Sequence, residues 1–115
     1  MPLLRISTAK QVTREDQEKI LTEASSMVSK ELGKPEGYVM TQFEGVETMT
    51  FAGSTEPACF LQLKSIGLPE AKTKELSAAL CDFVDARLGI ARNRVYIEFF
   101  DAPRTMWGFN SSTFG

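Results

Sequence analysis

The alternation of apolar and polar residues along the chain predicts four strands and two helices. Short apolar runs bounded by turn residues predict strands at residues 3–7, 38–43, 58–66 and 95–101. The third run shows the pattern most clearly, because Cys59, Leu61 and Leu63 fall on one face of a strand. Residues 45–53 are expected to form a loop, with at most a short strand at 49–51.

Apolar residues at helical spacing predict one helix after Thr13 and a second helix that begins at Pro69. Thr13 is placed as an N-cap, because acidic residues occupy the turn that follows it. Each helix ends in a Leu-Gly pair, at residues 32–33 and 88–89, where glycine suits the left-handed end of a helix. The order β-α-β therefore occurs twice, in halves of about 1–57 and 58–115 of a single domain spanning residues 1–115.

Right-handed crossovers would place both helices on the same face of one sheet, in an α/β (α+β) fold. The opposite face then carries Phe60, Ile66, Tyr96 and Phe100, which make it too apolar for full contact with water. At about 25 cal/mol per Å² of apolar area, exposure of these side chains would forgo several kcal/mol. We therefore expect another subunit to cover this face and to create clefts between chains, where small-ligand sites are common.

The composition excludes several classes of function. Its 43% hydrophobic and 24% charged residues are typical of a globular domain. The net charge of −2 and the absence of a Lys/Arg run argue against nucleic-acid binding. No apolar stretch approaches the ~20 residues of a membrane-spanning helix and no signal-peptide pattern is present, so we expect no membrane insertion and a cytoplasmic protein. The chain has no histidine, and Cys59 and Cys81 lack metal-ligand spacing, so we expect buried free thiols and no metal site.

Pro2 is the first candidate for chemistry. Removal of Met1 by an aminopeptidase would turn the nitrogen of Pro2 into a secondary amine at the end of a strand. An α-amino group titrates near ~7.7–8.0, and burial beside a cation lowers that pKa, so the amine could act as a general base at neutral pH. The alternative is that Pro2 only begins an edge strand, where a missing N–H group does no harm.

Several short sequences occur in the order and spacing of a known family. They are Met1-Pro2, Gly33-Lys34-Pro35 followed by Tyr38, residues 51–57 (FAGSTEP), Ser65-Ile66-Gly67, Arg94-Val95-Tyr96-Ile97 and residues 110–114 (NSSTF). With these sequences the chain resembles the macrophage migration inhibitory factor family of the tautomerase superfamily over nearly its whole length. The resemblance implies the tautomerase fold, a four-stranded mixed sheet with two antiparallel helices on one face, and a homotrimer around a central channel.

The same resemblance implies an isomerase that needs no cofactor. Its substrates would be aryl α-keto acids such as phenylpyruvate and hydroxyphenylpyruvate, and dopachrome esters. The N-terminal proline would move a proton between the α-carbon and the enol oxygen. The site would lie between adjacent subunits, so that Tyr96 comes from the neighbour of the chain that supplies Pro2.

Each position that matches the family's site also has a plainer explanation. Lys34 matches a lysine whose cation would pair with the substrate carboxylate and lower the pKa of Pro2, and it could also serve as a cation at a helix C-terminus. Ile66, with Ser65 beside it, matches a position whose backbone contacts substrate, and its side chain could instead pack in an interface. Tyr38 and Tyr96 match aromatic pocket positions, and each could be a buried tyrosine with a satisfied hydroxyl.

The chain departs from the family pattern at three places. Glu98 stands where better-known members carry an asparagine, and an ionised carboxylate there would repel a keto acid and raise the pKa of Pro2. Trp107-Gly108-Phe109 replaces an aliphatic residue, glycine and tryptophan, so we expect a reshaped pocket rim to which Phe109 and Phe114 contribute substrate contacts. The family's C-x-x-C motif reads Ala58-Cys59-Phe60-Leu61 here, and its proposed thiol-disulfide activity is not carried over.

Two other functions stay open at this point. One is a cytokine-like signalling protein, exported without a signal peptide, that binds a cell-surface receptor through the trimer surface. The other is a trimer whose tautomerase pocket is vestigial.

Overall fold

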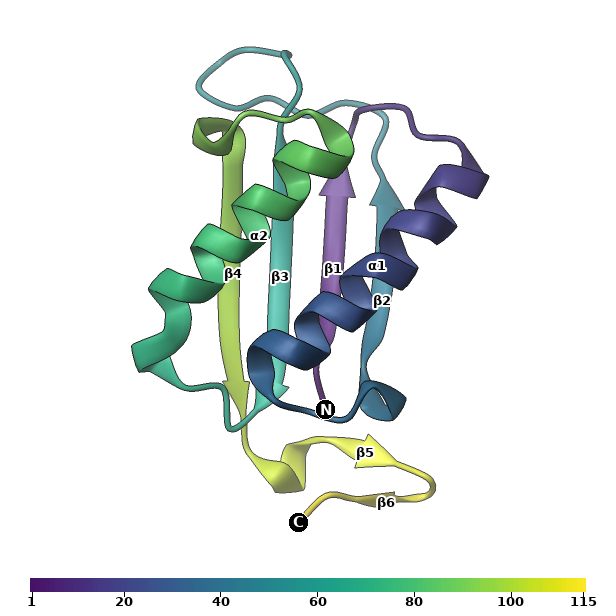
Figure 1. The fold of residues 1–115 in the computed structure, drawn as a ribbon, viewed down its shortest axis with the longest axis vertical. Coiled ribbons are helices and arrows are strands. Elements are labelled where there is room, and N and C mark those ends of the chain that lie inside the picture. Colours follow the sequence, from purple (N-terminus) through teal and green to yellow (C-terminus); the bar gives the residue numbers. More distant parts are fainter.

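Two helices cover one face of a four-stranded sheet in the computed structural model, which describes residues 1–115 (Figure 1). The strands are β1 (Leu3–Thr8), β2 (Met40–Gly45), β3 (Cys59–Ile66) and β4 (Val95–Ala102), and the helices are α1 (Arg14–Leu32) and α2 (Thr73–Leu88). The strand order is β2-β1-β3-β4, with parallel outer pairs and an antiparallel central pair. The predicted mixed sheet with antiparallel helices on one face is thus confirmed (Figure 1). No helix reaches the length and apolarity that a bilayer crossing requires.

The hydrophobic core lies between the sheet and the two helices. At the centre of the sheet Leu4 pairs with Leu63, and Ile6 with Leu61, and none of these side chains is more than 1% exposed. Leu68 and Ile90, which lie outside the helices, are also buried in this layer. The helices contribute further large apolar groups, which are Ile20 and Val28 from α1, and Leu76, Leu80, Phe83, Val84 and Leu88 from α2. Because these residues recur at helical spacing, one stripe of each helix is buried.

The helix ends agree with the sequence prediction. The Thr13 hydroxyl accepts a hydrogen bond from the Asp16 N–H at 3.2 Å, as an N-cap does. Gly33 and Gly89 both adopt left-handed conformations, with φ of 64° and 66°, and end α1 and α2. The predicted start of α2 is wrong by one turn. Pro69 precedes a short 3-10 helix, η2 (Glu70–Lys72), and α2 begins at Thr73.

Two other predicted segments need correction. Tyr38 does not belong to β2, because its N–H bonds to the carbonyl of Pro35 in a 3-10 turn, η1 (Glu36–Tyr38). The short strand expected at residues 49–51 is reduced to a single bridge between Phe51 and Ser54. Two further 3-10 turns, η3 (Arg92–Arg94) and η4 (Arg104–Met106), flank β4.

A C-terminal hairpin was not predicted from the sequence. Its strands are β5 (Gly108–Phe109) and β6 (Ser112–Thr113), and they form a separate two-stranded sheet. The turn between them uses Asn110 and Ser111, both at positive φ, of 50° and 65°. Hairpin turns of this kind usually contain glycine, so the sequence lacked the usual signal.

The open face of the sheet is partly as expected. Tyr96 and Phe100 are 66% and 54% exposed, whereas Ile66 is only 7% exposed and was wrongly assigned to the uncovered surface. Ile66 is the last residue of β3 and pairs with buried Ala102, at a corner that the chain itself covers.

One row of this open face is entirely polar. Arg5 pairs in register with Gln42 and Gln62, and Gln62 with Glu98, so the row crosses all four strands. Arg5 donates to the side-chain oxygens of both glutamines, at 3.1 and 3.4 Å, and Gln62 donates to Glu98 at 2.9 Å. These hydrogen bonds join the cation of Arg5 and the anion of Glu98 through a neutral amide.

Candidate active site

An apolar cavity of about 400 Å³ lies beside the N-terminus. Three segments that are distant in sequence meet there: the start of β1, the residues around η1, and the C-terminal hairpin. Figure 1 shows the N-terminus and the β5–β6 hairpin together at one end of the sheet. The lining residues are Met1, Pro2, Leu3, Gly37, Tyr38, Val39, Met40, Trp107, Gly108, Phe109 and Phe114.

Three aromatic rings form one wall of this cavity. Phe109 and Phe114 are stacked, with ring centroids 5.4 Å apart and an interplanar angle of 10°. Tyr38 meets both rings edge-on, at 5.6 and 5.9 Å. Stacked and edge-on contacts are the preferred geometries of aromatic pairs, so the wall is well suited to a flat apolar group.

Pro2 is held in place at the base of the cavity. Its side chain is fully buried, and its carbonyl accepts a hydrogen bond from the Met40 N–H at 2.9 Å. Met1 lines the cavity next to it. While Met1 is attached, the nitrogen of Pro2 belongs to an amide and has no basicity. Removal of Met1 would enlarge the cavity and leave a secondary amine there.

Lys34 lies close to this chain end, although it does not line the cavity. Its N–H donates to the Ser29 carbonyl at 3.1 Å, and its carbonyl accepts from the Ser29 hydroxyl at 2.6 Å, so its backbone is fixed at the end of α1. Burial, and after it the Lys34 ammonium, lowers the pKa of the Met1 amino group below its ordinary value. The surroundings of the chain end therefore favour a neutral amine.

Ser65 and Ile66 are buried at the end of β3 and do not line the cavity. The Ser65 hydroxyl donates to the Ile66 carbonyl at 3.3 Å. The following turn is held by Asp101, whose carboxylate accepts from the N–H groups of Gly67 and Leu68 at 2.9 and 3.1 Å. The position of this segment is thus fixed by β4.

Tyr96 and Glu98 lie away from Pro2. Tyr96 pairs with Phe60, and Phe60 pairs with Ser7 at the far end of β1. Pro2 and Ser7 are about 17 Å apart along the strand, at ~3.4 Å per residue. One chain therefore cannot bring Pro2 and Tyr96 to the same small ligand.

The cavity unites four of the predicted site residues, Pro2, Tyr38, Phe109 and Phe114. Leu3, Met40 and Trp107 also line it and were not predicted as site residues. Trp107 could have been included, because it stands in the altered C-terminal motif. Met40 gave no such signal, since an apolar residue in a strand is more often part of the core.

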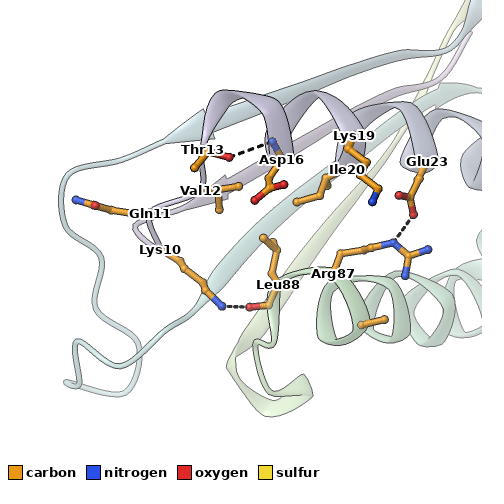
Figure 2. A pocket seen from close by; sticks show the side chains of 11 residues that line it. Lys10, Gln11, Val12, Thr13, Asp16, Lys19, Ile20, Glu23, Arg87 and Leu88 are labelled. Carbon is orange, nitrogen blue, oxygen red and sulfur yellow. Dashed lines mark hydrogen bonds and ion pairs between the residues drawn. The ribbon is translucent and has the colours of Figure 1, made fainter.

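A larger cavity of about 580 Å³ lies between the start of α1 and the end of α2 (Figure 2). Three of its charged side chains, Lys10, Glu23 and Arg87, already have partners in the chain. Lys10 donates to the Leu88 carbonyl, and Arg87 forms an ion pair with Glu23. The cavity holds no thiol or terminal amine, so we place the candidate site at the smaller cavity.

Cys59 offers no nucleophile, whereas Cys81 is only half-buried, so the expectation of buried thiols holds for Cys59 alone. Cys59 is 2% exposed, and burial, followed by the neighbouring Cys81, raises the pKa of its thiol to about 12. The thiol is therefore protonated at neutral pH. No group of three or more His, Cys, Asp or Glu side chains gathers in a way that could hold a metal ion.

Comparisons with known proteins agree on one family. The sequence matches the family described as Macrophage migration inhibitory factor (MIF) over residues 1–115. A macrophage migration inhibitory factor homolog of Brugia malayi is 43% identical over 96 residues, covering 83% of this chain and 84% of the relative. A homolog of Trichinella spiralis is 34% identical and covers 99% of this chain and 100% of its own length. The crystal structure of a homologue from Prochlorococcus marinus superposes with a TM-score of 0.92 and 42% identity, covering 98% and 99% of the two chains.

The cysteine assignment can be tested by alkylation at pH 7.5. Cys59 is expected to resist iodoacetamide in the native protein and to react only after unfolding, because only the thiolate attacks. Half-buried Cys81 is the internal comparison and should react faster. Peptide mass spectrometry reads both sites, and rapid native labelling of Cys59 would contradict the assignment.

Proposed function

The chain belongs to the macrophage migration inhibitory factor family, and on this basis we propose that it is a cofactor-independent keto-enol tautomerase for aryl α-keto acids of the phenylpyruvate type. One observation carries the proposal. Pro2 lines an apolar cavity with an aromatic wall, next to the Met1 amino group, whose pKa is lowered by burial and by Lys34. The aromatic wall fits the aryl group, and the lysine fits the carboxylate.

The proposed reaction uses Pro2 as both base and acid after Met1 has been removed. The neutral amine takes a proton from the carbon next to the keto group. The C–H electron pair then forms the C=C bond, and the C=O π pair moves onto oxygen. The resulting ammonium donates its proton to that oxygen, which completes the enol and restores the amine. Such general acid–base catalysis contributes typically 10²–10⁴-fold, and orientation in the cavity supplies more.

We further propose that the working site forms between subunits of a homotrimer. Pro2 and Tyr96 lie at opposite ends of one sheet, so a second chain must supply Tyr96 if both contact the same substrate. The exposed Tyr96 and Phe100 on the open face support such an assembly.

Pro2→Gly is expected to lower kcat/KM for phenylpyruvate by about 10²–10⁴-fold, the usual contribution of a positioned acid–base group. Pro69→Gly is the matched control, since it makes the same change at an exposed turn far along the chain. Enol formation is followed by absorbance, and intact mass reports whether Met1 is present. Equal turnover by the parent and Pro2→Gly, both without Met1, would rule out Pro2 as the base.

Lys34→Ala should reduce kcat/KM by about 10- to 150-fold, which corresponds to a charge-assisted hydrogen bond of ~1.5–3 kcal/mol. The variant should also shift the acid limb of the pH–rate profile. Activity rises with pH as the amine loses its proton, and removal of the cation that lowers its pKa moves this limb to higher pH. Lys34→Arg keeps the positive charge and should leave the acid limb in place. Lys30→Ala removes a nearby cation in the last turn of α1 and should not shift the limb. An unshifted limb in Lys34→Ala contradicts the electrostatic role.

Glu98→Asn should raise kcat/KM for phenylpyruvate by roughly two- to fivefold, since a solvated charge pair at short range contributes about 1 kcal/mol or less. The amide can still accept the hydrogen bond from Gln62. Glu44→Gln is the control, because the carboxylate of Glu44 also lies on a strand and also accepts a side-chain hydrogen bond, from the Ser7 hydroxyl. No gain from Glu98→Asn over the parent would show that Glu98 does not repel the substrate.

A further inference from the structure

The loop between β2 and β3 contains a tight turn with an unusual backbone. Phe51 and Ser54 exchange two backbone hydrogen bonds of 3.0 Å, and the two residues between them, Ala52 and Gly53, have φ of 53° and 73°. A left-handed conformation is unfavourable for a residue with a side chain, so Ala52 is strained. Strain of this kind persists where surrounding contacts determine the backbone, and it is common near functional sites.

Most of the side-chain hydrogen bonds to this loop come from Arg94. Its guanidinium donates to the carbonyls of four loop residues, at 3.0 to 3.2 Å, which are Phe51, Ser54, Glu56 and Pro57. Arg94 forms no ion pair, whereas Arg92, two residues earlier, pairs with Asp82 and Asp85. A planar guanidinium with five donors can serve several acceptors in one plane, which an ammonium cannot do.

Arg94 is also connected to Tyr96 through an aromatic ring. The guanidinium lies over the ring of Phe51, 5.2 Å from its centroid. The ring of Phe51 in turn packs against that of Tyr96, with centroids 4.7 Å apart. Because Tyr96 is 66% exposed in the single chain, few other contacts within that chain restrict its ring. Phe51 therefore has a large share in setting its orientation.

We propose that Arg94 is a positioning residue for the intersubunit pocket: it holds the loop of residues 51–57 and, through Phe51, orients Tyr96 for the neighbouring subunit. The inference rests on the proposed function, in which Tyr96 contacts substrate bound at the Pro2 of another chain. Figure 1 shows this loop at the end of the sheet opposite to the N-terminus. Loss of Arg94 thus leaves the Pro2 cavity of its own chain unchanged and alters what that chain presents to its neighbour.

The kinetic test compares Arg94→Gln with Arg92→Gln in the full chain without Met1. Arg94→Gln should raise the KM for phenylpyruvate by about tenfold or more with kcat changed less than about threefold, because a misplaced pocket group weakens substrate binding while Pro2 stays intact. Arg92→Gln removes the same charge two residues away and should leave both constants unchanged. Phe51→Leu keeps Arg94 and its acceptors and should raise KM in the same way, so the test does not depend on the folding of Arg94→Gln.

A double-mutant cycle separates positioning from a general structural role. In a Tyr96→Ala background, Arg94→Gln should have no further effect on KM if it acts through the Tyr96 ring. Additive effects of Arg94→Gln and Tyr96→Ala on KM overturn the proposal. It is also overturned if Arg94→Gln and Phe51→Leu have the same KM as Arg92→Gln.

A readout without turnover keeps this inference distinct from the proposed function. The chain has two tyrosines, Tyr38 and Tyr96, so 3-fluorotyrosine labelling gives two ¹⁹F resonances. Arg94→Gln should shift the Tyr96 resonance and leave that of Tyr38 in place, and Arg92→Gln should shift neither. An unmoved Tyr96 resonance in Arg94→Gln refutes the positioning role. Absence of Pro2-dependent turnover in the parent refutes the proposed function alone.

Discussion

Leu4 and Ile6 of β1 meet Leu63 and Leu61 of β3 at the antiparallel centre of the sheet, under the two helices. Full burial of each such side chain contributes about 1.5–3 kcal/mol. A shift of the pairing by one residue would turn all of these side chains to the open face, so their burial specifies the register. This pairing joins the two β-α-β units, and β2 and β4 pair in parallel on its two sides.

The direction of this central pairing also determines where chemistry can occur. The start of β1, the turn after α1 and the C-terminal hairpin come together at one end of the sheet, and they enclose Pro2 in an apolar cavity. Because β4 runs parallel to β3, Tyr96 is carried to the other end. A single chain therefore keeps Pro2 and Tyr96 apart, which agrees with the proposed trimer.

The open face has its own organisation. A polar row from Gln42 to Glu98 crosses the middle of the sheet, and it places the Glu98 carboxylate in contact with an amide. The Glu98 carboxylate is thus hydrogen-bonded within the row as well as exposed to solvent. Beyond this row, Arg94 donates to four carbonyls of a strained loop and lies over the ring of Phe51, which packs against Tyr96.

The features that depend on residues close together in the chain could be predicted from the sequence. Alternation identified the strands, helical spacing and the Thr13 cap identified α1, and the Leu-Gly pairs identified both helix ends, because each depends on residues within a few positions of one another. Pro2 was found for the same reason, from its place beside Met1. Only the tertiary structure revealed the burial of Ile66 and the 3-10 turn at Tyr38. It also showed that Trp107 and Pro2 line the same cavity and that Arg94 donates to four loop carbonyls. These features depend on groups distant in sequence, whose proximity is decided by how the sheet and its helices pack.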